Sequence, residues 1–427
     1  MNKYRQLEMK EITHMRKEEY KYFVGTTLKN PLQYAPGEKM IFKIRVKYMD
    51  GYLDIPFVWY SLTSDDGQKT EGYIRKGDDG WFYIEASISK SGFVYVQAKA
   101  CDENKRLIEG IATYNGSAGA DVNGILRATK IPDGYLEFWD GLKAEVEACE
   151  PEVLYCEEIK NDSDFEMYDM RIKAPRSDYV SVAIAYPKGA KKNSLKLAMS
   201  FQGYGVNPAG AVPLKNHFSV SVNAHSIPNG KDAEFYADIR DNKLKGYGYD
   251  AEENKNPQST YWVKMMLRDL QAIRFFKDHE LLDKKNYCFI GSSQGGMQAC
   301  NVAAHFDRAT AVVLNVPWLS DIYGHELCGR RENNMPKGLG VTYFDTAVAA
   351  RFLKCSAYII SGLGDVTCNA STQMALFNSI KSPKYIEFYQ NKVHSFTIPW
   401  DKNMYALGEP SLADEFEEYT EQYHAFD

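Results

Sequence analysis

The sequence has no excess of positive charge and no hydrophobic run long enough to cross a membrane. Its 51 lysines and arginines are outnumbered by 57 aspartates and glutamates, which gives a formal net charge of −6. A chain with this balance is not drawn to nucleic acid or to an anionic membrane surface. The longest apolar stretches, such as residues 311–319, are far shorter than the ~20 residues that a membrane-spanning helix needs. We therefore expect neither nucleic acid nor a membrane as a partner.

An apolar segment near the N-terminus and closely spaced cysteine pairs are also missing. The first residues carry many charges and contain no run that could act as a secretory signal. We expect a cytoplasmic protein, or a secreted or periplasmic one if a leader has been removed. None of the eight cysteines belongs to a C-x-x-C pair, so no zinc or thioredoxin-type site is expected. Reduced, buried thiols are favoured over a disulfide framework, because a chain of 427 residues can build its core without cross-links.

Internal repeats and low-complexity segments are absent, and the composition is that of an ordinary folded protein. Apolar residues make up 44% of the chain and charged residues 25%. These values exclude a disordered chain, a collagen and a coiled-coil rod. The length of 427 residues suggests two or three domains.

The N-terminal part of the sequence has the pattern of short strands. After a charged, helix-prone start of about 30 residues, apolar residues alternate over residues 40–48, and Asp50-Gly51 follows as a hairpin signal. Short strands with no long helix among them are typical of an antiparallel sandwich. We predict an all-β, immunoglobulin-like sandwich domain over residues 1–128. Further strands are predicted at residues 56–62, 81–88 and 93–100.

The rest of the sequence, residues 129–427, alternates between strands and helices after a helix predicted at 135–148 and a hairpin at 165–187. Continuous apolar runs are expected of central parallel strands. The alternation predicts a doubly wound, mostly parallel α/β sheet. The predicted strands are 195–201, 218–222, 287–290, 311–315, 357–361 and 385–389, and the predicted helices are 261–281, one ending at 305, and 411–423.

The most informative motif is Gly291-Ser292-Ser293-Gln294-Gly295-Gly296, which contains the pattern G-x-S-x-G. A short apolar strand precedes it and a small-residue helix follows it, which is the setting of a nucleophile elbow. At such a turn the serine takes a strained backbone conformation, and glycines two residues before and after it avoid collisions. We predict Ser293 as a nucleophile; a glycine-rich turn around a buried serine is the alternative.

Backbone amides near this turn could stabilise a developing negative oxygen. The first amides of the helix after Ser293 point toward the site, and a second donor comes from the loop after an early strand. The segment Phe201-Gln202-Gly203-Tyr204-Gly205 follows such a strand, and its glycines allow a close backbone approach. We predict the amides of Gln294 and Tyr204 as the oxyanion hole, with an ordinary glycine turn at residues 203–205 as the alternative.

A serine hydroxyl also needs a base that takes its proton. In α/β-hydrolases the acid and the histidine follow the serine in chain order. Asp365 and His394 each follow an apolar strand-like run, and the carboxyl ends of parallel strands are where open α/β sheets place their sites. We predict Asp365 as the acid and His394 as the base.

Other histidines offer alternatives for the base. His225 is the reserve candidate, and His217 and His325 are also open. His279 and His305 fall at predicted helix ends, where surface capping is the expected role. An ordinary turn aspartate is the alternative for Asp365.

These residues resemble a known family. From about residue 130 to 400 the chain is similar to the acetyl xylan esterase and cephalosporin-C deacetylase family of α/β-hydrolases, carbohydrate esterase family seven. The resemblance implies that Ser293, Asp365 and His394 form a catalytic triad, with no metal and no organic cofactor. The segments that carry it are Tyr135–Trp139, Gln202–Tyr204, Gly291–Gly296, Asn315–Leu319 and Gly364–Thr372.

Three departures from the family pattern concern the acyl substrate and the family's ring-shaped oligomer. Ser395 stands where the family usually has glutamate, Asn369 and Ala370 replace two prolines, and Ala224-His225-Ser226 stands near the expected R-G-Q segment. The N-terminal sandwich could also interfere with that assembly, so a homo-oligomer stays open.

The resemblance implies a serine carbohydrate esterase that removes acetyl groups from acetylated plant-derived oligosaccharides through an acetyl-enzyme intermediate, a step in polysaccharide degradation. A prolyl-oligopeptidase-type serine peptidase is one alternative, although the sandwich lacks the repeats of a propeller. A catalytically inactive glycan-binding protein is the other, since aromatic residues make up 13% of the chain.

Overall fold

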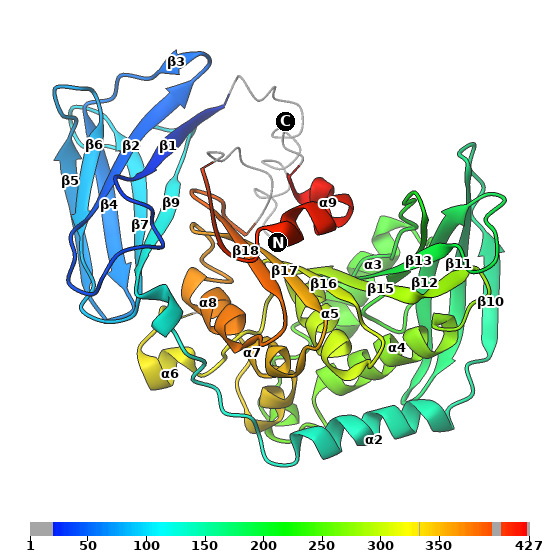
Figure 1. Cartoon of the computed structure of the whole chain (residues 1–427). Coiled ribbons are helices and arrows are strands. Elements are labelled where there is room, and N and C mark those ends of the chain that lie inside the picture. The colour runs from blue at the N-terminus through cyan, green and yellow to red at the C-terminus, as the bar shows by residue number, and fades with distance from the viewer. Residues whose placement is uncertain (1–19, 333, 395–402, 425–427) are drawn as a thin grey trace.

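The computed structural model describes residues 20–332, 334–394 and 403–424 and has an all-β part followed by a larger α/β part (Figure 1). In the all-β part, one sheet has the order β3-β2-β1-β8 with β6 also paired to β2, and the other has the order β5-β4-β7-β9. Its strands are β1 (Lys21–Thr27), β2 (Met40–Tyr48), β3 (Gly51–Tyr52), β4 (Phe57–Ser64), β5 (Lys69–Arg75), β6 (Phe82–Ala86), β7 (Gly92–Cys101), β8 (Ile111–Ala112) and β9 (Tyr114–Ala120).

Alternation of apolar residues builds the core between these two sheets. Phe42 and Ile44 of β2 are buried against Val58 of β4 and Val96 of β7, while the intervening residues of β2 are more exposed. The predicted sandwich strands are therefore present. The predicted hairpin after β2 is also present, with Tyr48 paired to Gly51 across a turn at residues 49–50.

The helix-prone reading of the start of the chain is wrong where the structure describes it. β1 pairs along its length with β2, and Phe23 is fully buried. Three more strands of this part, β5, β8 and β9, have no matching prediction. β9 reads Tyr-Asn-Gly-Ser-Ala-Gly-Ala and lacks the β-branched residues that mark a strand.

The α/β part is built on a ten-stranded sheet of order β10-β11-β12-β14-β13-β15-β16-β17-β18-β19. The strands from β14 to β18 in this order are parallel, and β10, β11, β12 and β19 run antiparallel to their neighbours. The strands are β10 (Val153–Glu158), β11 (Phe165–Ala174), β12 (Ser177–Pro187), β13 (Leu195–Phe201), β14 (His217–Val222), β15 (Leu282–Ser292), β16 (Ala311–Asn315), β17 (Ser356–Gly362), β18 (Lys384–Tyr389) and β19 (Met404–Gly408).

Helices cover both faces of this sheet (Figure 1). Val312 and Leu314 of β16 share a core with α4, α5 and α8, whereas Val313 faces a smaller core with α9. The helices are α2 (Tyr135–Ala148), α3 (Ala233–Asp238), α4 (Tyr261–Phe276), α5 (Gln294–His305), α6 (Gly324–Cys328), α7 (Thr346–Ala349), α8 (Ala370–Ser379) and α9 (Ser411–His424), with shorter turns at η2 (Val122–Gly124), η3 (Ile239–Lys243), η4 (Glu253–Lys255), η5 (Leu339–Phe344) and η6 (Ala350–Phe352).

The predicted doubly wound, mostly parallel α/β fold is confirmed, with local differences. α4 ends five residues earlier than predicted, and β15 begins five residues earlier. The predicted boundary after residue 128 falls in the irregular stretch between η2 and α2 and stays a prediction. All eight cysteines are free thiols. Among the described residues, no helix combines the length and the apolar character that crossing a membrane requires.

Candidate active site

Ser293 stands at a sharp turn between β15 and α5, with φ 56° and ψ −119°. This is the strained conformation that the G-x-S-x-G motif predicts. A Cβ atom on Gly291 would lie 2.1 Å from the Gly295 carbonyl oxygen, and one on Gly295 would lie 2.1 Å from the Phe201 carbonyl oxygen. Only glycine fits at either position, so both glycines are needed for the turn between β15 and α5 to form against β13.

Three side chains from distant parts of the sequence form one hydrogen-bonded chain at this turn. His394 Nε2 lies 3.0 Å from Ser293 Oγ, and His394 Nδ1 lies 2.8 Å from Asp365 Oδ2. The Asp365 side chain is fully buried, whereas the imidazole is 30% exposed. The structure therefore brings together the three residues that the sequence predicts, with the imidazole between the hydroxyl and the carboxylate.

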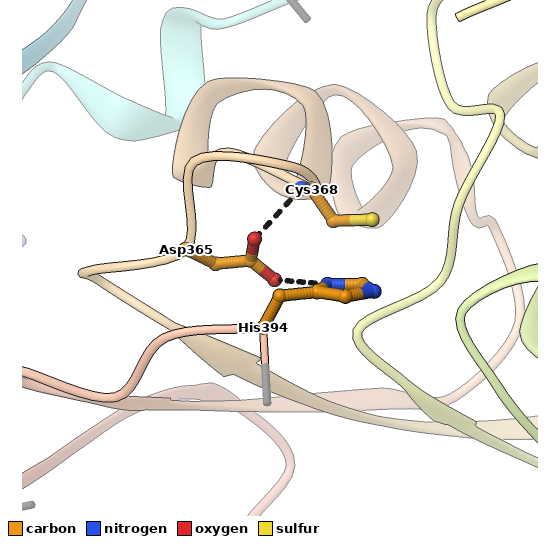
Figure 2. A group of neighbouring side chains, drawn as sticks. All are labelled: Asp365, Cys368 and His394. Atoms are coloured by element: carbon orange, nitrogen blue, oxygen red, sulfur yellow. Dashed lines mark hydrogen bonds and ion pairs between the residues drawn. The ribbon is translucent and has the colours of Figure 1, made fainter. Parts of the chain in front are cut away.

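The loop after β17 fixes the Asp365 carboxylate. Its Oδ1 accepts hydrogen bonds from the backbone amides of Thr367 at 2.8 Å and Cys368 at 2.9 Å. Oδ2 is left for His394 (Figure 2). Three hydrogen bonds hold the carboxylate in one orientation, so the imidazole that it contacts is also held.

Cys368 brings a third possible metal ligand close to Asp365 and His394, with the candidate ligand atoms all within 4.8 Å of one another. Burial, together with the nearby Asp365 carboxylate, holds the pKa of the Cys368 thiol well above its usual range. A protonated thiol is a poor metal ligand, because metals bind the thiolate. The donors therefore fit a proton-transfer chain better than a metal site.

The two backbone amides predicted as oxyanion donors lie on either side of the contact between Gly295 and Phe201. Gln294 is the first residue of α5, and Tyr204 lies in the loop after β13. Within the part of the chain that the structure describes, neither amide has a hydrogen-bond partner. Both N–H groups are thus available to a ligand.

Tyr247, which the sequence analysis did not single out, joins these two elements. Its hydroxyl donates to Gln294 Oε1 at 2.8 Å and accepts from the amide of Gly205 at 3.1 Å. Its ring stacks on that of Tyr204, with centroids 4.4 Å apart. The segment Gly246-Tyr247-Gly248-Tyr249 is the sole sequence signal for this residue.

His225, the reserve candidate for the base, holds the same loop instead of contacting Ser293. Its Nε2 lies 2.8 Å from the Gly205 carbonyl oxygen, and its Nδ1 lies 2.6 Å from the Tyr261 hydroxyl. Burial lowers the pKa of His225 to about 4. The imidazole is therefore neutral at pH 7, with one nitrogen donating to the carbonyl and the other accepting from the hydroxyl.

The predicted surface role of His305 is wrong. His305 is buried in the core, where its ring stacks on Trp139 with centroids 4.1 Å apart and its Nε2 lies 3.0 Å from the Tyr135 hydroxyl. Both partners belong to α2, which packs over the end of α5. His279 is half-buried and accepts a hydrogen bond from the amide of Leu281, as expected of a residue at a chain turn.

A buried lysine lies behind the three hydrogen-bonded side chains. Lys392 Nζ is 3.4 Å from Asn315 Oδ1, and the Asn315 carbonyl accepts the backbone hydrogen bond of Ser293. Burial lowers the pKa of Lys392 to about 7, against the opposing effect of Asp365 and Glu387. A group whose charge changes near neutral pH is therefore built into the floor of the site.

A comparison with known protein families gives a match over the part of the chain that contains these residues. A family model described as acetyl xylan esterase (AXE1) matches residues 125–325 and 328–407, which is more than half of the chain. The chain belongs to the acetyl xylan esterase family. The resemblance predicted from the motifs is thereby confirmed, and the family match begins where the all-β part ends.

One relative of this family member is similar in sequence and two solved structures are similar in fold. Acetyl esterase Axe7A of Xylanibacter ruminicola is 26% identical over 276 residues, which are 60% of this chain and 62% of that protein, less than two thirds of its length. The solved acetyl xylan esterase from Paenibacillus sp. R4 has a TM-score of 0.54 at 17% identity and covers 70% of this chain and 98% of its own. Acetyl xylan esterase 1 from Thermoanaerobacterium sp. JW/SL YS485 has a TM-score of 0.53 at 19% identity, over 70% of this chain and 97% of its own.

Proposed function

We propose that this member of the acetyl xylan esterase family is a serine carbohydrate esterase that removes acetyl groups from acetylated plant-derived oligosaccharides. The observation that carries the proposal is the hydrogen-bonded chain from Ser293 Oγ through His394 to the buried Asp365, at an elbow with free amides beside it. Family membership supports the same activity and does not favour a peptidase or an inactive glycan-binding protein.

The geometry suits acyl transfer in two steps. Ser293 Oγ attacks the acetyl carbonyl carbon while its proton passes to His394 Nε2, and Asp365 stabilises the resulting imidazolium. The amides of Gln294 and Tyr204 bind the oxyanion. As the carbon–oxygen bond breaks, the leaving sugar oxygen takes the proton from His394 and becomes a hydroxyl. Water then attacks the acetyl-enzyme, again through His394, and releases acetate and the free Ser293 hydroxyl.

Two exposed tyrosine rings beside the predicted oxyanion amide support a sugar as the leaving group. Tyr204 is 45% exposed and Tyr249 is 36% exposed, with ring centroids 6.2 Å apart, and the buried Trp318 ring lies 6.2 Å from that of Tyr204. The flat apolar face of a sugar ring packs well on such a surface, while its hydroxyls remain in water. An acetylated sugar on these rings would bring its ester toward the elbow.

The test is hydrolysis of p-nitrophenyl acetate by the parent and by Ser293→Ala. We expect the alanine variant to lose nearly all turnover while it keeps the parent's circular dichroism spectrum and melting temperature. Equal turnover by the two proteins would refute the assignment. Acetate release from acetylated xylo-, manno- and pectic oligosaccharides would then identify the sugar, and peptide hydrolysis without ester hydrolysis would favour the peptidase instead.

A further inference from the structure

The all-β part of the molecule contacts the loop that carries His394. Gln390, which is fully buried, pairs with the backbone of Ser117 in β9: its Oε1 accepts from the Ser117 amide and its Nε2 donates to the Ser117 carbonyl, both at 3.1 Å. Gln390 Nε2 also donates to Thr26 Oγ1 in β1 at 3.3 Å. Its side-chain amide thus bonds to both sheets of the all-β part.

Asn391 makes a second pair of bonds to the same two strands. Its Oδ1 accepts from the Asn115 amide of β9 at 2.8 Å, and its Nδ2 donates to the Phe23 carbonyl of β1 at 2.9 Å. Asn391 has φ 59°, a left-handed conformation that asparagine tolerates better than most residues. The chain therefore turns three residues before His394 at a point fixed by the all-β part.

The loop that carries Asp365 meets the same strand. A Cβ atom on Gly364 would lie 2.2 Å from the Asn115 carbonyl oxygen, so the two backbones are in direct contact. The Gly364 amide also donates to the Lys392 carbonyl at 3.1 Å. Asn115 thus contacts both loops. Its amide bonds to the loop of His394, and its carbonyl touches the loop of Asp365.

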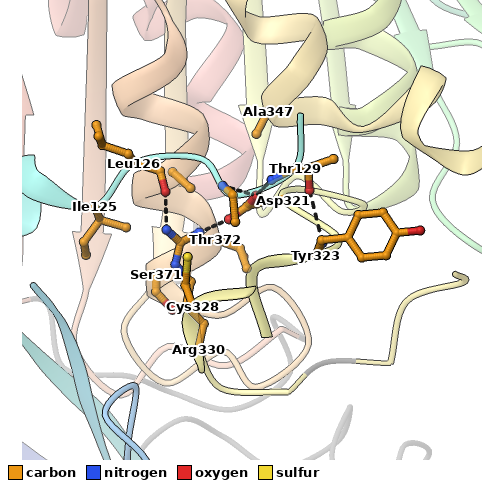
Figure 3. A network of polar contacts seen from close by, with 12 residues as sticks. Ile125, Leu126, Thr129, Asp321, Tyr323, Cys328, Arg330, Ala347, Ser371 and Thr372 are labelled. Carbon is orange, nitrogen blue, oxygen red and sulfur yellow. Dashed lines mark hydrogen bonds and ion pairs between the residues drawn. The ribbon is translucent and has the colours of Figure 1, made fainter. Parts of the chain in front are cut away.

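Further buried contacts hold the all-β part in place around these loops. The Tyr95 hydroxyl of β7 lies 2.7 Å from Ser371 Oγ at the start of α8, and Asp65 accepts a bond from the Arg331 amide at 2.8 Å. Where the chain leaves the all-β part, Asp321 accepts from the amide of Thr129 and forms a buried ion pair with Arg330 (Figure 3). The placement of β1 and β9 is therefore fixed from several sides.

We propose that β1 and β9 position the loops of Asp365 and His394 for catalysis, and that Asn391 and Gln390 are the positioning residues through which they act. This inference rests on the proposed function. The strands lie outside the segment that the family model matches, so this chain supplies from its own N-terminal part a support for the reacting groups. Support of this kind matters because displacement of a reacting group by about 1 Å can cost about a hundredfold in rate.

The test uses the full-length protein and two variants that remove the bonds from opposite sides. Asn391→Gly tolerates the positive φ but deletes both side-chain bonds, and Thr26→Val deletes one acceptor of Gln390 within β1. We expect kcat for p-nitrophenyl acetate to fall about 10- to 100-fold in Asn391→Gly and several-fold in Thr26→Val. KM should stay within about twofold, because the Asn391 and Thr26 side chains bond within the protein and have no role in substrate binding in the proposed mechanism.

Lys90→Ala is the matched control. Lys90 Nζ donates to the Cys328 carbonyl at 2.7 Å, across the same interface but away from both loops. We expect the parent's kcat from this variant. All assays are run well below the lowest melting temperature, so that a loss of rate does not reflect unfolding.

A second readout separates this inference from the proposed function. The rate at which a fluorophosphonate labels Ser293 depends on the serine and histidine but not on the natural substrate. If the parent does not hydrolyse the ester but labelling slows in Asn391→Gly, the proposed function fails and the positioning role stands. Parent-like labelling and kcat in both variants, or an equal loss in Lys90→Ala, would overturn the positioning role.

Discussion

The Asp365 carboxylate sets which nitrogen of His394 carries a proton. Its Oδ2 accepts from His394 Nδ1, so the neutral imidazole presents an unprotonated Nε2 to Ser293 Oγ. In Asp365→Asn the amide group would donate to Nδ1 instead, and the proton would move to Nε2. The imidazole could then no longer accept the proton of the serine, although the size of the side chain is unchanged.

We therefore predict that Asp365→Asn lowers kcat for p-nitrophenyl acetate by about 10³- to 10⁴-fold with little change in KM. Steady-state kinetics of the purified variant measures both constants. Cys368→Ala is the control, because its thiol neighbours the carboxylate but takes no part in the hydrogen-bonded chain. A kcat for Asp365→Asn within tenfold of the parent would contradict this role.

His305 makes stability depend on pH. Burial lowers its pKa to about 3, with a smaller lowering effect of Lys143. The pKa of an unfolded histidine is about 6.5, so the unfolded chain takes up this proton first as the pH falls. The resulting loss of stability is absent above about pH 6.5 and grows down to about pH 3.

Through His305 the parent should lose about 3 kcal/mol of unfolding free energy between pH 7 and pH 4, because each pH unit between the two pKa values is worth about 1.4 kcal/mol. We predict that His305→Gln does not show this part of the loss. Urea titrations at several pH values measure this dependence in parent and variant. His225 adds a similar effect that both proteins share. The slope with pH is the readout, because the variant also loses the contact with Trp139; identical slopes would show that His305 does not contribute.

At the scale of elements, the sequence predicts best where one local signal decides the structure. The apolar runs of β13 and β16 and the amphipathic pattern of α2 predict their limits to the residue. α8 has no matching prediction, because it is buried nearly all round and so lacks a polar face. β9 is a strand because it pairs with β7 and packs against the loop after β18, not because of its own residues.

The residues of the candidate site also differ in whether a local sequence signal predicts them. Ser293, Asp365 and His394 could be predicted because each follows a strand, and parallel strands end at one edge of a sheet. Tyr247 and Asn391 could not, because each acts through partners that only the folded chain brings near. His305 was placed wrongly because its position at the end of α5 gives no sign that α2 covers it.

The junction of β13, β15 and α5 depends on close backbone contact at Gly295. A methyl group there would meet the Phe201 carbonyl and push α5, with the amide of Gln294, away from the loop of Tyr204. We predict that Gly295→Ala costs about 1–3 kcal/mol of stability and lowers kcat about a hundredfold. Urea titration and ester kinetics measure the two effects.

Gly141→Ala provides the matched control for that substitution. Gly141 lies inside α2, and a Cβ atom there would meet nothing within 4 Å. Alanine at this position should raise stability by about 0.5–1 kcal/mol and leave kcat unchanged. If Gly295→Ala behaved like this control, the close contact would not be required for catalysis.

At the scale of the whole molecule, buried polar contacts join the α/β part to the all-β part and to the stretch that connects the two. The Asp321 carboxylate and the Arg330 guanidinium are almost completely buried, and the amides of Ala128 and Thr129 donate to the same carboxylate. Arg330 also donates to the Leu126 carbonyl (Figure 3). Separation of the two parts would expose these groups and break the bonds of Gln390 and Asn391, so we expect the two parts to unfold together.

Arg330→Leu tests this coupling. The substitution leaves the buried Asp321 carboxylate without its counter-charge, which costs about 3–5 kcal/mol, and the double variant Asp321→Asn/Arg330→Leu should recover part of that loss. Hydrogen exchange measured by mass spectrometry across a urea series follows both parts of one molecule. We predict a single midpoint for peptides from β1 to β9 and peptides from the ten-stranded sheet, shifted together in Arg330→Leu. If the all-β peptides exchanged at a lower urea concentration than the rest, the two parts would be independent units, and the single-transition prediction would be wrong.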